Sequence, residues 1–166
     1  MILAVDVQYR NDYATAAGVL FPSWESDTPS DELVAESEQV AAYRPGQFYL
    51  RELPCILALL PRIHNQPACF IIDGYISLGK EGKPGLGMHL WNALAGKIPV
   101  IGVAKSRYMD TAEECELYRG RSKRPLYVTA VGISLDEAKE HIRGMHGVHR
   151  IPTMLKRVDQ LCRGLI

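Results

Sequence analysis

Two aspartates stand out because each lies in, or at the end of, an apolar run. Asp6 interrupts the run at residues 2–7, and Asp73 ends the run at residues 68–73, directly before Gly74. Both runs are typical of buried strands, where an unpaired carboxylate is costly. Two such acids therefore indicate a shared cation. The alternatives are acids that accept backbone amides or that pair with Lys105.

A third acid, Glu52, lies on a predicted helix at residues 49–63. Apolar residues recur there at helical spacing, at Cys55, Ile56, Leu59, Leu60 and Ile63. Glu52 falls on the same stripe, which should face the sheet. Its alternative is a helix-start acid favoured by the helix dipole, and Pro54 leaves the start of the helix open.

The donor types indicate which ion would bind. Carboxylate oxygens without His or Cys nearby favour Mg²⁺, with Mn²⁺ as a substitute, over zinc. Such an ion activates water, binds a phosphate and stabilises the leaving oxygen in phosphodiester hydrolysis.

The elements that must position these acids follow from the hydrophobic pattern. Residues 2–9, 14–21 and 33–40 predict a three-stranded antiparallel meander. After the helix at 49–63 come strands at 68–73, 98–104 and 126–131, a glycine-rich loop at 79–87, and helices at 88–95, 136–145 and 154–165. This alternation implies a parallel part of the sheet. The layout predicts a ribonuclease H-like α/β fold, with a mixed central sheet flanked by helices. Asp6 and Asp73 would meet if their strands are neighbours.

Size and composition fit one domain over residues 1–166, with 47% hydrophobic and 23% charged residues. No apolar run reaches membrane-spanning length and no signal peptide is evident, so we expect a cytoplasmic, monomeric protein without a membrane partner. The cysteines lack metal-ligand spacing and are expected to be reduced; they are Cys55, Cys69, Cys115 and Cys162.

The net charge is zero, but the charges are unevenly distributed. Residues 25–38 hold six acids and no Lys or Arg, whereas residues 118–125 hold four basic residues, among them Arg121 and Lys123, and no acid. Such a basic loop could follow a phosphate backbone, and a solvated turn is the alternative.

Four motifs in order carry a resemblance to a known family. They are VDVQY at residues 5–9, YRPG at 43–46 followed by YLRELP at 49–54, IDG at 72–74 and IPVIGVAKS at 98–106. These segments resemble the motifs of the endonuclease V family. The match runs to about Val131, with weaker similarity at residues 149–152.

The resemblance implies a metal-dependent endonuclease that nicks DNA or RNA on the 3′ side of inosine. Asp6 and Asp73 would hold the catalytic metal, and Glu52 would bind a metal-linked water or a second ion. Lys105 would offset the negative charge that builds at the phosphate. Substrate contacts would come from a strand-separating wedge at Tyr43, Arg44, Pro45 and Gly46.

Departures from the family pattern concern the substrate-facing loops. The family's helix ahead of the first strand has no counterpart here, and the loop at residues 75–84 lacks the family's two histidines. Lys80 and Lys83 would replace the family's missing His and Arg of this loop as phosphate contacts, with Gly85 alongside, although a glycine-rich loop without that role is an equal alternative.

The sequence leaves alternatives for the roles of two further residues and for the function of the protein. His89 is more typical of a core or surface histidine than of a ligand. Asp159 lies where ribonuclease H-like enzymes often add a fourth carboxylate, but the sequence does not fix its helix face and a solvent-facing acid is the more typical case. The functional alternatives are a non-catalytic nucleic-acid-binding relative and a nuclease indifferent to inosine.

Overall fold

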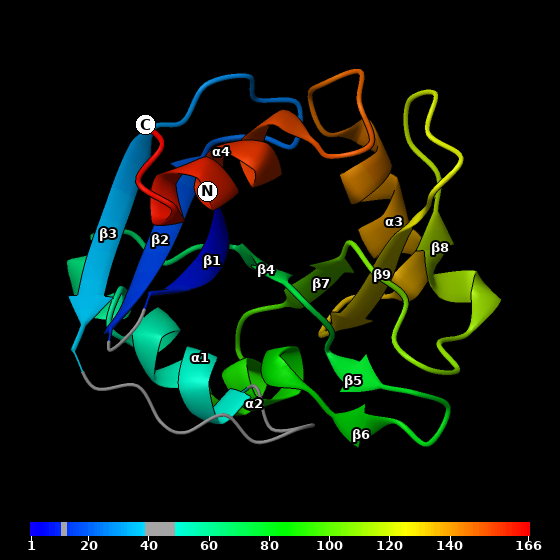
Figure 1. Cartoon of the computed structure of the whole chain (residues 1–166), viewed down its shortest axis with the longest axis horizontal. Helices are drawn as coiled ribbons and strands as arrows, with labels where there is room; N and C mark the ends of the chain where they lie inside the picture. Colours follow the sequence, from blue (N-terminus) through cyan, green and yellow to red (C-terminus); the bar gives the residue numbers. More distant parts are fainter. Residues whose placement is uncertain (11–12, 39–48) are drawn as a thin grey trace.

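The computed structural model describes residues 1–10, 13–38 and 49–166. A seven-stranded sheet runs through it in the order β3-β2-β1-β4-β7-β9-β8 (Figure 1). Its strands are β1 (Ile2–Arg10), β2 (Tyr13–Phe21), β3 (Asp31–Ser37), β4 (Cys69–Asp73), β7 (Val100–Ala104), β8 (Glu116–Leu117) and β9 (Leu126–Val131). The predicted wedge, Tyr43 to Gly46, lies outside the described residues.

The pairing of the strands confirms the predicted mixed sheet. β1, β2 and β3 form the antiparallel meander, while β4 pairs in parallel with both β1 and β7. β9 runs antiparallel to β7, because the chain reaches it through the loop and short elements of residues 105–125 and not through a crossover helix. An antiparallel meander followed by parallel strands is the ribonuclease H-like arrangement.

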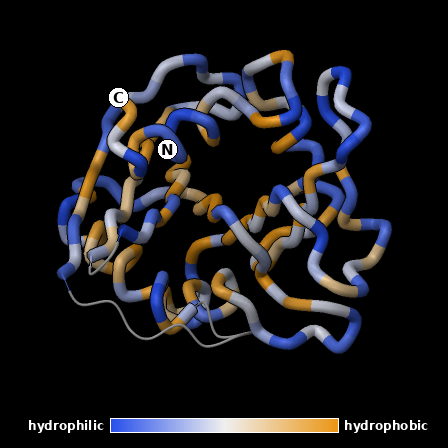
Figure 2. Tube along the Cα trace, viewed as in Figure 1, coloured by the Kyte–Doolittle hydropathy of each residue, from blue (hydrophilic) through white to orange (hydrophobic). Residues whose placement is uncertain are grey.

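Helices cover both faces of the sheet (Figure 1). α1 (Tyr49–Leu57) and α2 (Leu86–Ala93) pack on one face, and α3 (Leu135–Gly144) and α4 (Thr153–Cys162) pack on the other. Side chains alternate between the two cores along β1, with Leu3 and Val5 facing α1 and α2, and Ala4 facing α3 and α4. Figure 2 shows these hydrophobic stretches running along the central strands.

The long helix after the meander and the glycine-rich loop both differ from the prediction. The helix expected over residues 49–63 ends at Leu57 and is followed by a 3₁₀ turn, η1 (Leu60–Arg62), in which Pro61 lacks the N–H that a continuing helix needs. The glycine-rich loop folds into a small hairpin of β5 (Ser77–Leu78) and β6 (Lys83–Pro84).

The segment after β7 contains a 3₁₀ turn, η2 (Glu113–Cys115), that leads into β8. Among the described helices, none has the length and apolarity to cross a membrane.

Candidate active site

Asp6, in the middle of β1, and Asp73, the last residue of β4, lie side by side on neighbouring strands. The parallel register pairs Val5 with Ile72, so each aspartate follows directly after a paired residue. Asp6 is half-buried, and its Oδ1 accepts the Val7 N–H at 2.8 Å. Burial, and then the charge of Asp73, raises the Asp6 pKa to about 7. The predicted meeting of the two acids is therefore confirmed.

The environment of Asp73 differs from the sequence prediction. Its strand is buried from Cys69 to Ile72, but the Asp73 side chain is 35% exposed, because it extends past the last packed position of β4. The prediction that Asp73 is a buried acid was wrong. The alternative pairing with Lys105 is present, since the Lys105 Nζ donates to Asp73 Oδ2 at 3.0 Å.

Glu52 approaches the two aspartates from α1. It is half-buried, and burial followed by the charges of Asp6 and Asp73 raises its pKa to about 8. The acid that was out of pattern on the helix stripe therefore faces Asp6 on β1 and Asp73 at the end of β4. Burial and neighbouring carboxylates disfavour the charged forms of Asp6 and Glu52, which is the electrostatic setting that a cation relieves.

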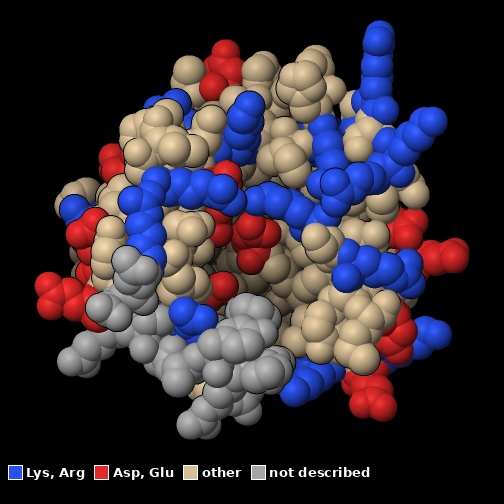
Figure 3. Space-filling model, viewed as in Figure 1, with Lys and Arg blue, Asp and Glu red and all other residues tan. Residues whose placement is uncertain are grey.

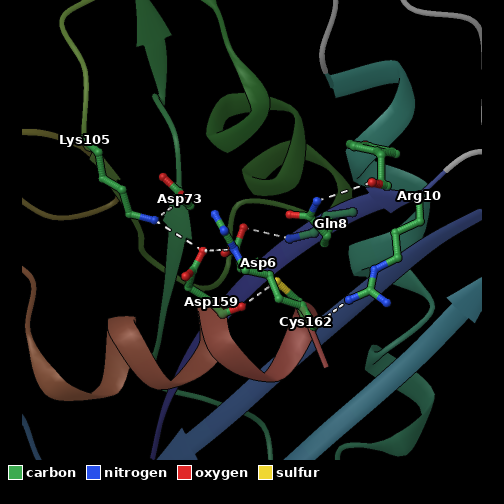
Figure 4. A network of polar contacts seen from close by, with 10 residues as sticks. Asp6, Gln8, Arg10, Asp73, Lys105, Asp159 and Cys162 are labelled. Carbon is green, nitrogen blue, oxygen red and sulfur yellow. Dashed lines mark hydrogen bonds and ion pairs between the residues drawn. The ribbon is translucent and has the colours of Figure 1, made fainter. Parts of the chain in front are cut away.

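Lys105 and Asp159 complete this group of charges, and Figure 4 shows Lys105 reaching toward Asp159 on α4. The Lys105 Nζ lies 3.7 Å from Asp159 Oδ1, and Arg163 Nε lies 3.0 Å from the same oxygen. Burial lowers the Lys105 pKa, but the charges of Asp73, Asp6 and Asp159 outweigh that effect and raise it overall. The ammonium therefore stays charged beside the acids.

The donor set suits a hard cation, and the present positions of the side chains do not enclose one. Among the described residues, no three Asp, Glu, His or Cys side chains are arranged to hold a metal ion together. A hollow of about 20 Å³, roughly the volume of one water, is bordered by Asp6, Asp73 and Lys105 and otherwise by apolar side chains, and Glu52 does not line it. Asp6, Asp73 and Glu52 are the residues that would hold a metal ion, once the Lys105 ammonium leaves the Asp73 oxygen.

A larger cavity of about 320 Å³ opens beside the acids. Glu52 and Asp73 form one wall, and Tyr49, Tyr75 and Tyr108 supply aromatic surface. Tyr75 and Tyr108 were not predicted, although each lies within three residues of a predicted acid or lysine in the sequence. The cavity combines apolar walls with a few polar groups, as ligand sites do.

The walls of this cavity are built by close backbone packing. Gly85, a predicted site residue, lines it, and a Cβ at this position would lie 2.7 Å from the Tyr75 carbonyl oxygen. His89 on α2 stacks on Tyr49 with ring centroids 3.7 Å apart, and burial lowers its pKa. The histidine thus supports an aromatic wall of the cavity.

The predicted basic contacts lie on the surface. Lys80 and Lys83 are exposed on the β5–β6 hairpin, and Arg121 and Lys123 are exposed on the loop before β9. Figure 3 shows Lys and Arg side chains in a band along one side of a hollow whose floor holds acidic side chains.

Two arginines that the sequence did not mark as structural hold the loops around the site. Arg119, one of the four basic residues of the loop, is 6% exposed and donates to the carbonyls of Met145, Gly147 and His149, so it is not a surface cation. Arg150 donates to the carbonyl of Lys105 and, at 2.7 Å, to that of Pro125.

Comparisons with known proteins agree with this geometry. The Endonuclease V family model matches residues 1–127. An endonuclease V from Streptomyces avermitilis is 30% identical over 185 residues, covering 98% of this chain and 79% of the relative. The crystal structure of the endonuclease V from that organism aligns with a TM-score of 0.74 at 28% identity, covering 99% of this chain and 80% of the other.

A further similar structure is the Ciona intestinalis endonuclease V in complex with a 24mer DNA containing an inosine followed by a ribo-adenosine. It aligns with a TM-score of 0.77, covering 99% of this chain and 84% of the other, and its 21% identity shows the shared fold. The family match spans most of the chain and includes Asp6, Glu52, Asp73 and Lys105. The chain belongs to the endonuclease V family.

Proposed function

We propose that the protein is a Mg²⁺-dependent endonuclease that hydrolyses the phosphodiester bond on the 3′ side of inosine in DNA or RNA. The proposal rests on an acidic group and an aromatic cavity that lie side by side in a member of the endonuclease V family. Glu52, whose pKa is raised by burial and then by the charges of Asp6 and Asp73, lies with Asp73 at the wall of an aromatic cavity.

The acidic group fits the ion that the proposal requires. Asp6 and Asp73 are hard oxygen donors on adjacent strands, and Glu52 faces them from α1. A bound Mg²⁺ or Mn²⁺ would supply Lewis-acid activation of water and of the phosphate.

The protein's own groups would set the geometry of the reaction. Asp6 and Asp73 would hold the metal ion that binds the scissile phosphate, and Glu52 would orient and activate the attacking water. Lys105, released from Asp73, places its positive charge against the phosphate as negative charge builds there.

The cavity supports recognition of a base that has left the stack. Its volume of about 320 Å³ lies at the lower end of the range for small-ligand sites of roughly 300–1,000 Å³, which suits one flat ring system. Tyr49, Tyr75 and Tyr108 offer surfaces on which a base can stack. The Ciona intestinalis relative was crystallised with inosine-containing DNA, which is consistent with inosine as the substrate base.

The distribution of charge supports a nucleic-acid partner. The net charge is zero, so attraction to phosphates must be local. The band of Lys and Arg beside the acidic hollow provides that attraction (Figure 3). Lys80, Lys83, Arg121 and Lys123 are the exposed candidates for phosphate contacts.

The test is a nicking assay on end-labelled oligonucleotides that carry either inosine or adenine at one position, as DNA and as RNA, in Mg²⁺, Mn²⁺ or EDTA. We expect cutting only at inosine, only with the metal, and one product whose length maps the cut to the 3′ side. Asp73→Asn should abolish it, while Asp27→Asn, an exposed loop acid, should not.

The other outcomes separate the alternatives. Cutting of both oligonucleotides identifies a nuclease indifferent to inosine, and binding without cutting identifies a non-catalytic relative. Full activity in EDTA or in the Asp73→Asn protein contradicts the proposed role of the acids.

A further inference from the structure

Met109 is an exposed apolar side chain in a region where the chain would be expected to present polar groups. It is 77% exposed, and its backbone has a φ of +40°, in the left-handed region that non-glycine residues seldom adopt. Both features cost stability, since neither the contact with water nor the backbone conformation is favourable.

The turn that carries Met109 is held in place by hydrogen bonds on both sides of it. Arg107 donates to the carbonyls of Met109 at 3.3 Å and of Thr111 at 2.7 Å. The Thr111 backbone N–H and hydroxyl both donate to the Tyr108 carbonyl, at 3.0 Å and 2.5 Å. None of these bonds uses the Met109 side chain, so the turn presents it to solvent in a fixed place.

The turn is also joined to the elements around the large cavity. The Tyr108 N–H donates to the Tyr75 hydroxyl at 3.1 Å, and both rings line the cavity. On its other side, Asp110 Oδ1 accepts the Lys80 N–H at 3.2 Å, which ties the turn to the β5–β6 hairpin. Met109 therefore directly follows Tyr108, which lines the cavity, and itself lines an adjacent hollow that shares Tyr108 and Leu78 with the cavity.

The charges near Met109 are mixed. It shares a surface hollow with Lys80, Lys83, Glu81 and Asp110. Charges of both signs do not select a charged ligand here, and the thioether is the most exposed apolar group of this hollow. A polarisable, unbranched side chain suits contact with an aromatic face, and apolar side chains of this kind enter base steps in proteins that distort duplexes.

We propose that Met109 inserts into the base stack of a duplex substrate and fills part of the gap left by the nucleotide that enters the neighbouring cavity. This inference rests on the proposed function, because it takes the occupant of the cavity to be a base drawn out of a stack. Met109 would act as a positioning residue for duplexes. A single strand has no stack to hold open, so the residue would matter little there.

The experiment compares duplex and single-stranded oligonucleotides that contain one inosine with 2-aminopurine as the next base. Binding is followed by 2-aminopurine fluorescence in EDTA, and nicking is measured under single-turnover conditions in Mg²⁺. We expect Met109→Ala to weaken duplex binding and slow duplex nicking about tenfold, to reduce the fluorescence increase, and to change the single-strand values less than twofold. Met109→Leu should retain most of the duplex activity.

Two controls separate insertion from loss of fold. Val148→Ala removes an apolar side chain of similar exposure, 79%, from a different loop and should leave both substrates unaffected. Met109→Gly relieves the backbone strain, so it should unfold at an equal or higher urea concentration than wild type while losing duplex activity.

The outcomes distinguish the two proposals. Wild-type protein that treats inosine and adenine alike overturns the proposed function and this inference with it. Wild-type protein that prefers inosine, with Met109→Ala equal to it or equally impaired on duplex and single strand, overturns this inference alone.

Discussion

Asp6→Asn should make the metal-free protein more stable at pH 8, because the carboxylate of Asp6 lies where its charge is unfavourable. Burial and the charge of Asp73 raise its pKa from 3.8 to about 7. Between these values the folded state retains a proton that the unfolded chain has released, so stability falls as the pH rises. This penalty is absent below about pH 4 and complete above about pH 7.

The size of the effect follows from the shift. About three pKa units correspond to at most about 4 kcal/mol. The repulsion is shared among Asp6, Glu52 and Asp73, and an asparagine amide also loses some hydration there, so we expect a gain of about 1–3 kcal/mol at pH 8. Asparagine still offers an oxygen to the Val7 N–H, so that hydrogen bond survives the substitution.

The assay is urea unfolding in EDTA at pH 5 and pH 8, since guanidinium is a salt and would screen the repulsion. Asp27→Asn, an exposed loop acid, is the matched control. Replacing EDTA with Mg²⁺ should stabilise wild type and not Asp6→Asn, because binding to the folded state alone adds stability. Equal pH dependence in wild type and Asp6→Asn would refute the reasoning.

Three further substitutions test the surroundings of the site. Lys105→Met should bind Mg²⁺ about tenfold more tightly in calorimetric titration, because the Lys105 ammonium lies 3.0 Å from an Asp73 oxygen and competes with the ion for it. The variant should nonetheless nick more slowly, and weaker Mg²⁺ binding would contradict this competition. Arg150→Ala should lower kcat with little change in KM, because the Arg150 guanidinium holds the Lys105 carbonyl. Arg150→Lys should recover only part of the lost kcat. A change in KM alone would argue against a role of Arg150 in positioning Lys105. Gly102→Ala should lower the free energy of unfolding in urea by about 1–3 kcal/mol, since the added Cβ would lie 2.5 Å from a backbone carbonyl oxygen. In Gly144→Ala the added Cβ meets nothing within 4 Å, so this control should be tolerated. Equal stability of the two variants would contradict the packing argument.

The central sheet could be predicted because its signals are local. The apolar runs that contain Asp6 and Asp73 define β1 and β4, and alternation places both acids on the same face. Glu52 was recognisable as an acid on an apolar helix stripe. The exposure of Asp73 was not predictable, because it depends on how far α4 and the neighbouring loops extend over the end of β4.

The loop contacts were also beyond the sequence. Arg119 and Arg121 lie in the same basic loop, yet Arg119 is buried against carbonyls and Arg121 is exposed. Nothing in the local pattern separates them, because the carbonyls that receive Arg119 belong to residues 145–150. The turn around Met109 likewise depends on the hairpin at residues 77–84.

By itself, the sequence determined the order of the strands and helices and which acids lie on the central strands, because hydrophobic periodicity is a property of neighbouring residues. Only the tertiary structure decided that Lys105 contacts both Asp73 and Asp159, that three tyrosines line a cavity beside the acids, and which arginines are buried. These contacts join residues distant in the sequence, and their geometry depends on how the loops close over the sheet.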